Sequence, residues 1–158
     1  MSRYDCRSDT CFVVINDARY SLMISQQRTN EMGKKKKKIV KVFIVDDSAV
    51  LRERLITILS ELKGIEIIGQ AKGPLEAQEA IPKLKPDVVI LDIRMPGGNG
   101  IDVLENIKKG KSPPIVIMFT NYPYPQYRKK YMDAGADFFF DKSTEFEKVI
   151  DVLKKLTQ

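Results

Sequence analysis

Five side chains that could do chemistry follow apolar runs of this sequence. Asp46 and Asp47 come directly after KVFIV, and Asp92 ends the run DVVILD. Thr120 ends PIVIMFT, and Lys142 follows shortly after three consecutive phenylalanines. Oxygen ligands without nitrogen or sulfur donors select Mg²⁺, and a carboxylate held beside such an ion can attack phosphorus. The sequence predicts metal-dependent phosphoryl chemistry if the fold brings these side chains together.

The pattern of apolar residues predicts the elements that would position them. Short β-branched runs predict five strands, and helical spacing predicts five helices that alternate with the strands. The strands are expected at 39–45, 65–71, 87–92, 114–120 and 138–140, and the helices at 48–62, 74–84, 100–108, 126–134 and 145–156. Such alternation is typical of a five-stranded parallel sheet with helices on both faces and right-handed crossovers. The expected fold class is therefore α/β.

Local signals add detail to this scheme. Thr144 and Glu147 have the spacing of a capping box before the last helix. Pro82 lies late in the second helix and is expected to end or kink it. The glycine-rich MPGGNG lacks the lysine and Ser/Thr of a phosphate-binding P-loop, so it is interpreted as a flexible turn before the third helix.

The carboxyl ends of parallel strands meet at one edge of a sheet, where such folds place their chemistry. Asp46 and Asp47 are expected to hold Mg²⁺ there, with one oxygen of Asp92 and the backbone carbonyl of Arg94 as further ligands. The second oxygen of Asp92 would form an aspartyl phosphate, stabilised by the lysine ammonium and the threonine hydroxyl. Each feature alone is ordinary, because paired aspartates are common at helix starts and a single lysine is usually a surface residue.

Composition excludes several other chemistries. The chain has 158 residues, of which 43% are apolar and 30% charged, as in ordinary globular proteins. It contains no histidine, which excludes a Ser-His-Asp triad, a histidine-bearing metal site and a phosphohistidine carrier within this chain. Cys6 and Cys11 are interpreted as free thiols.

The net charge of +6 is concentrated in one short segment. Lysines 34–38 carry five of these charges, and residues 39–158 have a net charge of only +1, so the charge gives no argument for DNA binding. Residues 1–38 are expected to be a disordered extension ending in this lysine run, and residues 39–158 one domain. No apolar run is long enough to span a membrane and no secretory signal is visible, so a cytoplasmic protein is expected.

The motifs VFIVDDS, LDIRMPGGNG, MFT and GADFFFDKS closely resemble those of the receiver domain of two-component response regulators. The resemblance covers residues 38–156 and implies a flavodoxin-like fold. It implies one role for each matching position: the phosphoacceptor Asp92, the Mg²⁺-binding acidic pair Asp46 and Asp47, the switch hydroxyl Thr120, the phosphate-contacting Lys142 and the switch aromatic Phe139.

One position departs from the family pattern. The family usually has proline after the lysine, often through a cis bond, whereas Ser143 follows Lys142 here. Two alternatives follow: the bond is trans and the loop shifts, or surrounding contacts hold it cis. Arg94 and Tyr122 lie two residues after the acceptor and the switch hydroxyl, so we expect them to restrict the approach of hydrolytic water and to modulate the phosphoryl lifetime.

The resulting hypothesis is a single-domain response regulator. A sensor histidine kinase or phosphotransfer protein would transfer a phosphoryl group to the acceptor in a Mg²⁺-dependent reaction, and the altered surface would bind an unknown downstream protein. The first alternative keeps the chemistry without an output, as a phosphate shuttle or sink. Catalysis would be limited to self-phosphorylation from small donors and autodephosphorylation.

Two further alternatives have less support. A Mg²⁺-dependent phosphatase that uses an aspartyl phosphate usually has a second aspartate two residues after the nucleophile, where this sequence has Arg94. A constitutive interaction module would be expected to lack a site residue, and none is missing.

Overall fold

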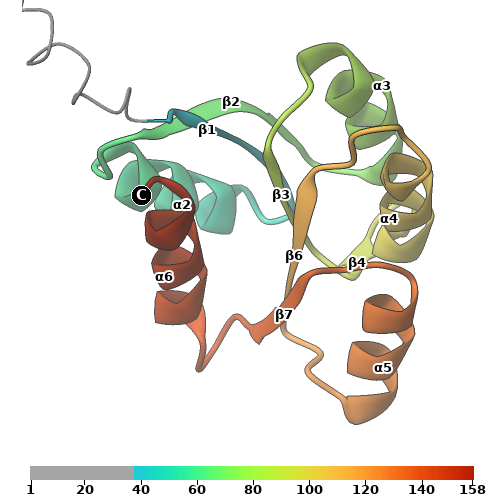
Figure 1. The fold of residues 1–158 in the computed structure, drawn as a ribbon. Coiled ribbons are helices and arrows are strands. Elements are labelled where there is room, and N and C mark those ends of the chain that lie inside the picture. The colour runs from blue at the N-terminus through green and yellow to red at the C-terminus, as the bar shows by residue number, and fades with distance from the viewer. Residues whose placement is uncertain (1–37) are drawn as a thin grey trace, which may run out of the picture. The chain divides into compact units, whose positions relative to one another are not determined.

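A computed structural model describes residues 38–158, which form a parallel five-stranded sheet in the order β2-β1-β3-β6-β7 (Figure 1). All four strand pairs are parallel, as the alternation of strands and helices predicts. The five strands are β1 (Val40–Val45), β2 (Ile65–Ala71), β3 (Val88–Leu91), β6 (Ile115–Thr120) and β7 (Phe138–Asp141).

Four helices connect the strands, a fifth follows β7, and together they cover both faces of the sheet. In Figure 1, α2 and α6 lie on one face, while α3, α4 and α5 lie on the other. Their bounds are α2 (Ala49–Ser60), α3 (Pro74–Leu84), α4 (Gly100–Lys108), α5 (Pro125–Asp133) and α6 (Phe146–Leu156). The predicted fold class is confirmed, and the bounds of the elements agree with the expected ones to within one or two residues.

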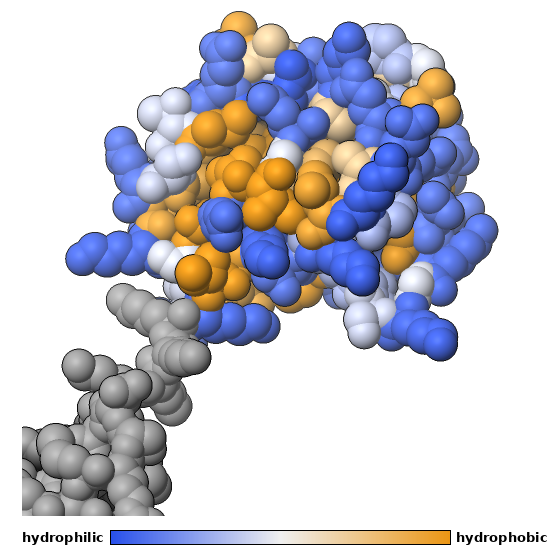
Figure 2. Space-filling view, turned by 90° about the horizontal axis from the view of Figure 1, so that it is seen from above, coloured by the Kyte–Doolittle hydropathy of each residue, from blue (hydrophilic) through white to orange (hydrophobic). Residues whose placement is uncertain are grey.

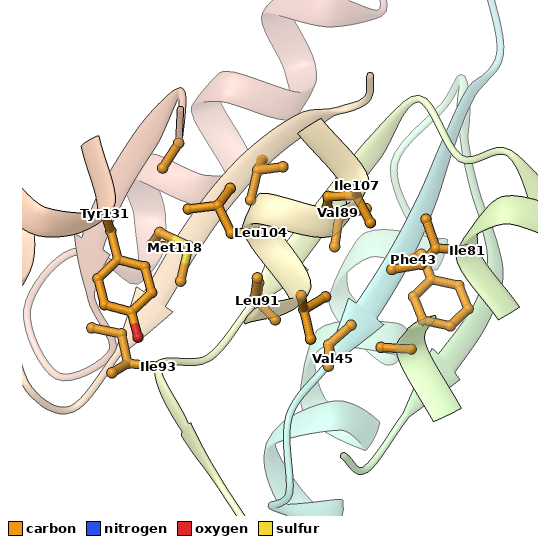
Figure 3. Packing of buried hydrophobic residues seen from close by; sticks show 14 of the residues in the cluster. Phe43, Val45, Ile81, Val89, Leu91, Ile93, Leu104, Ile107, Met118 and Tyr131 are labelled. Atoms are coloured by element: carbon orange, nitrogen blue, oxygen red, sulfur yellow. The ribbon is translucent and has the colours of Figure 1, made fainter. Parts of the chain in front are cut away.

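Alternation along the central strands divides the apolar core into two layers. In β1, Phe43 and Val45 pack toward the layer beneath α3 and α4, which Figure 3 shows from close by. Val42 and Ile44 belong to the other layer, which includes residues of α2 and α6. Burial of each such side chain stabilises the fold by about 1.5–3 kcal/mol, so the central strands are held from both sides.

The outer strand β2 is less completely covered than the central strands. Residues Ile65, Ile67 and Ile68 are half-buried, whereas β1 is buried at every position except Lys41. Figure 2 looks at the molecule from the top of Figure 1, where β2 runs, and shows apolar side chains bordered by hydrophilic ones. The centre of the sheet is therefore its best-protected part.

Three local expectations have different outcomes. Pro82 lies inside α3, which ends at Leu84 as expected, so the proline does not itself end the helix. The turn expected in the glycine-rich segment lies at residues 96–97, within an antiparallel hairpin of β4 (Arg94–Met95) and β5 (Gly98–Asn99) that was not expected. Gly97 makes its reversal possible, because its φ of 89° is in the region that favours glycine. The third expectation, a capping box before α6, fails because its helix has no side-chain cap.

The remaining two expectations concern the N-terminal extension and membrane-spanning helices. The predicted extension over residues 1–38 falls almost wholly outside the described residues. Within residues 38–158, none of the helices has the length and apolar character needed to cross a bilayer.

Candidate functional site

The acidic residues at the ends of β1 and β3 lie next to each other because the strand pairing continues beyond the strands. The Asp92 backbone N–H donates to the Val45 carbonyl at 3.0 Å, and the Asp46 N–H donates to the Ala71 carbonyl at 3.1 Å. These bonds hold both aspartates at the carboxyl end of the sheet. Both are buried, with 3% exposure for Asp46 and 6% for Asp92.

Asp47 completes a cluster of three carboxylates. One oxygen from each of Asp46, Asp47 and Asp92 lies within 4.8 Å of the others. Asp47 itself is exposed, so an ion held by the cluster would remain accessible from solvent. An all-oxygen donor set around one point fits a hard divalent cation such as Mg²⁺, which keeps several waters. The cluster could therefore hold the predicted metal.

The ammonium group of Lys142 bridges the two buried carboxylates. Its Nζ donates to Asp92 Oδ2 at 2.9 Å and to Asp46 Oδ2, and its side chain is only 7% exposed. The Lys142 backbone N–H also donates to the Thr120 carbonyl at 2.9 Å, which ties the lysine to the end of β6. The cluster contains three carboxylates, and the ammonium pairs with two of them, so the site keeps an excess of negative charge that favours a further cation.

The environment of Asp92 disfavours its charged form. Burial is the largest cause and raises the pKa of Asp92 above its ordinary value of 3.8. The positive charge and hydrogen bond of Lys142 oppose this effect, while the negative charge of Asp46 adds to it. The Ile93 backbone N–H donates to Asp92 Oδ1 at 2.7 Å and favours the carboxylate. A bound cation would reduce the cost of ionising this side chain.

Close packing of α4 against the backbone of Asp92 depends on Gly100. A Cβ at this position would lie 2.2 Å from the Asp92 carbonyl oxygen, which no side chain tolerates. The Gly100 N–H instead donates to the Ile93 carbonyl at 2.8 Å. The sequence predicted a helix that begins at this glycine. Its contact with Asp92 was not predicted, because it depends on how the start of α4 packs against the backbone that follows β3.

Thr120 ends β6, and Phe139 is the second residue of the neighbouring strand β7, in register with Met118. Thr120 is fully buried, and its Oγ1 accepts a hydrogen bond from the Tyr122 N–H at 3.1 Å. Phe139 is 2% exposed and therefore points inward. The Arg128 guanidinium lies 4.9 Å from the centre of its ring, and the Tyr131 ring lies at 6.5 Å. The predicted switch aromatic is thus held in its inward position.

The predicted modulating residues form one side of a cleft above the carboxylates. The Arg94 guanidinium stacks on the Tyr122 ring at 4.4 Å and donates to the Tyr127 hydroxyl at 3.0 Å. Tyr127 lies in α5, and its pairing with Arg94 was not predicted, because no spacing rule connects the two positions. The cleft has a volume of about 460 Å³ and is lined by these residues: Asp47, Ser48, Asp92, Arg94, Met95, Pro96, Asn99, Asn121, Tyr122 and Lys142.

The bond between Lys142 and Ser143 is trans, because residues 38–158 contain no cis peptide bond. This answers the question that the missing proline raised. The structure thus brings the predicted acidic residues, the lysine and the buried threonine to one end of the sheet. Their chemical roles remain predictions.

Comparison with known proteins gives consistent matches. The response regulator receiver domain family matches residues 42–154. The chain is 35% identical over 117 residues to the sensory transduction protein LytT of Bacillus anthracis. The matched region covers 74% of this chain and 47% of that protein. The response regulator domain of Thermotoga maritima CheB has a TM-score of 0.67 and 35% identity, with 75% of this chain and 94% of that chain covered.

A chain of a solved protein complex is also similar. A chain of the CheX–CheY–BeF₃–Mg²⁺ complex from Borrelia burgdorferi matches with a TM-score of 0.63 and 31% identity. That match covers 72% of this chain and 89% of the other. The chain spans about half the length of the LytT relative, so the match concerns the shared domain and not the activities of the whole relative.

Proposed function

Since the chain belongs to the response regulator receiver domain family, we propose that residues 38–158 act as a phosphorylation-controlled switch with Asp92 as the phosphoacceptor. The observation that carries the proposal is the cluster of Asp46, Asp47 and Asp92 with the Lys142 ammonium beside it. Three carboxylates within 4.8 Å of one another repel each other, and a single ammonium paired with two of them does not balance their charge, which supports a site that takes up a cation.

Each polar group of the site has a place in phosphoryl transfer. An oxygen of Asp92 attacks the phosphorus of a phosphohistidine, the P–N bond breaks, and the imidazole leaves with the bonding electrons. Asp46, Asp47, Asp92 and the Arg94 carbonyl would hold Mg²⁺, which supplies positive charge to the transferring oxygens. Lys142 then exchanges its contact with Asp92 for one with a phosphoryl oxygen.

Thr120 and Phe139 would transmit the change to the surface. A phosphoryl group adds nearly two negative charges, and the Thr120 hydroxyl would donate a hydrogen bond to it. Phe139 already occupies its inward position in this structure, so phosphorylation would stabilise one of two existing arrangements rather than create a new one. The surface that changes would include α5, whose residues Arg128 and Tyr131 contact the Phe139 ring.

Arg94 and Tyr122 would determine how long the phosphoryl group survives. Their stacked side chains line the cleft through which water must reach the phosphorus. A guanidinium held between Tyr122 and Tyr127 is less free to move than an unpaired one. We propose that this stack narrows the line of attack for water and slows hydrolysis.

The proposed donor is the phosphohistidine of a sensor kinase or phosphotransfer protein, because the chain has no histidine. The proposed output is binding of a protein partner to the altered surface near α5. A phosphate sink would share the chemistry but lack the change at that surface, so a structural readout of α5 separates the two functions.

Hydrogen exchange with beryllofluoride and Mg²⁺, which together mimic the phosphoryl group, tests the switch without a known partner. Exchange in α5 and β7 should change in the unaltered protein and in Asp87→Asn, which alters the opposite end of strand β3. No change should occur in Asp92→Asn. If beryllofluoride binds but α5 and β7 exchange as before, the sink is the better function; a response in Asp92→Asn would refute the acceptor.

A further inference from the structure

The short loop between β7 and α6 carries Lys142 and is closed around it by Asp141. The Asp141 Oδ1 atom accepts hydrogen bonds from the Ser143 N–H at 2.9 Å and from the Ser143 hydroxyl at 2.6 Å. Its Oδ2 atom accepts one from the Thr144 hydroxyl at 3.0 Å. One carboxylate before the lysine therefore binds both residues that follow it.

A second pair of bonds fixes the same loop from its other side. The Asp141 N–H donates to Glu145 Oε2 at 3.0 Å, and the Glu145 N–H donates to the Asp141 carbonyl at 2.9 Å. The Lys142 N–H is bound to the Thr120 carbonyl at 2.9 Å. Hydrogen bonds thus fix the backbone before, at and after the lysine. They do so although Ser143 stands where the family usually has a proline.

These bonds are not the cap of the following helix. A helix cap would accept from the N–H groups of the first turn of α6, which begins at Phe146, and its N-cap residue Glu145 makes no such bond. The Asp141 carboxylate is instead used entirely by the two residues between Lys142 and Glu145. The Ser143 hydroxyl bond is also the largest cause that lowers the pKa of Asp141, so the carboxylate stays charged.

We propose that Asp141 is a positioning residue for the phosphoryl-contacting lysine: its turn sets the backbone from which the Lys142 ammonium reaches the acceptor. The inference rests on the proposed function and adds to it the residue whose hydrogen bonds fix the loop in the absence of a proline at position 143. A lysine side chain has four rotatable bonds, so its ammonium is placed accurately only if its backbone is fixed. Displacement of a stabilising group by about 1 Å can slow a reaction 100-fold.

The test compares two properties of the site that this account separates. Mg²⁺ affinity, measured by calorimetry, depends on Asp46, Asp47 and Asp92, whereas the phosphorylation rate with acetyl phosphate at saturating Mg²⁺ also depends on the lysine. Asp141→Ala should slow phosphorylation about five- to tenfold, which corresponds to a barrier raised by roughly 1–1.4 kcal/mol, and leave Mg²⁺ affinity unchanged within about twofold.

A milder variant keeps the test decisive if Asp141→Ala fails to fold. Ser143→Ala removes only the 2.6 Å hydroxyl bond at an exposed position and should slow phosphorylation about two- to threefold. Asp137→Ala is the matched control, because Asp137 lies just before the same strand β7 and also accepts a backbone N–H. It should lower stability without slowing phosphorylation.

The double variants show whether Asp141 acts through the lysine. In a Lys142→Ala background, Asp141→Ala should change the residual phosphorylation rate by a factor close to one. An undiminished effect there, an equal loss of Mg²⁺ affinity, or an unchanged rate in both Asp141→Ala and Ser143→Ala would each overturn the positioning role. These outcomes leave phosphorylation of the unaltered protein intact. Failure of that phosphorylation would instead overturn the proposed function, and the inference with it.

Discussion

The two ends of the sheet both carry aspartates and a lysine, but they arrange them in opposite ways. At the amino end, Asp87 accepts a hydrogen bond from the Lys41 N–H at 2.9 Å. Asp137 accepts one from the Val116 N–H at 2.8 Å and pairs with Lys108 at 2.7 Å. Each of these two carboxylates accepts from a backbone N–H of its own, and the side chain of Asp137 is 40% exposed.

At the carboxyl end, the same residue types are crowded and buried. Asp46 and Asp92 share the Lys142 ammonium, and the three side chains are only 4–7% exposed. Asp47 adds a third carboxylate to the cluster. Residue type alone therefore does not separate a structural end from a chemical one. Crowding of like charge under burial does, because such crowding is costly unless a ligand relieves it.

Removal of divalent cations is expected to have the largest effect. With a chelator present, phosphorylation from acetyl phosphate should fall at least about 100-fold, since the carboxylates would then repel the incoming phosphoryl oxygens. Added Mg²⁺ should restore it. The measurement is intact-protein mass spectrometry after a fixed incubation. Full phosphorylation in the chelator would mean that the acidic cluster has no metal-dependent role.

Loss of the lysine should affect the two ends differently. Lys142→Ala leaves two buried carboxylates without their positively charged partner, which should cost about 3–5 kcal/mol in unfolding free energy without metal. Lys108→Ala removes a partly exposed pair and should cost about 1 kcal/mol. Denaturant unfolding measures both free energies. Added Mg²⁺ should reduce the difference from the unaltered protein only in Lys142→Ala. Equal losses at the two ends would contradict the difference in crowding.

The pKa of Asp92 gives the comparison a pH dependence. Because this pKa is raised in the folded protein, ionised Asp92 costs stability above the raised value, and the cost disappears as the pH falls toward 3.8. In the metal-free state, Asp92→Asn should therefore unfold at a higher temperature than the unaltered protein at neutral pH, by roughly 2–4 °C for each kcal/mol gained.

The gap between these two melting temperatures should close as the pH falls through the raised pKa of Asp92. Calorimetric scans in a chelator between neutral pH and about pH 4 would follow it. Asp87→Asn, at the amino end of the same strand, is the control and should show no such gain. A gap that widens toward acid would have the wrong sign for a destabilised carboxylate.

The smallest effect is expected from the stack beside the cleft. Arg94→Ala removes the guanidinium from Tyr122 and Tyr127 and should speed loss of the phosphoryl group about two- to fivefold, as expected for a contact of roughly 0.5–1 kcal/mol. Following the decay of the phosphorylated protein after donor removal measures this rate. Tyr127→Phe, which loses only the hydroxyl, should have a smaller effect in the same direction; slower decay in Arg94→Ala would show that the stack does not shield the phosphorus.

The central strands β3 and β6 could be predicted because each is an almost unbroken apolar run, which is typical of a strand buried on both faces of a sheet. The positions of Asp46, Asp92 and Thr120 followed from the same pattern, since parallel strands bring their carboxyl ends together. These parts depend on periodicity along the chain, which the sequence displays directly.

The features that escaped prediction depend on competition between side chains. Thr144 was expected to cap α6, but the N-cap residue is Glu145, and the Thr144 hydroxyl donates to the Asp141 carboxylate in the preceding loop. The hydrogen bond between Arg94 and Tyr127 joins residues 33 positions apart, one in β4 and the other in α5. Contacts of this kind depend on relative placement in space, which spacing along one chain does not reveal.

Mapping of the phosphoryl group tests the central claim most directly. The protein is incubated with acetyl phosphate and Mg²⁺, the acyl phosphate is reduced with borohydride, and the peptides are analysed by mass spectrometry. The account predicts a single modified residue, Asp92, and none in a parallel sample that contains a chelator. Modification of any other residue, or of none while the protein remains folded and binds Mg²⁺, would contradict it.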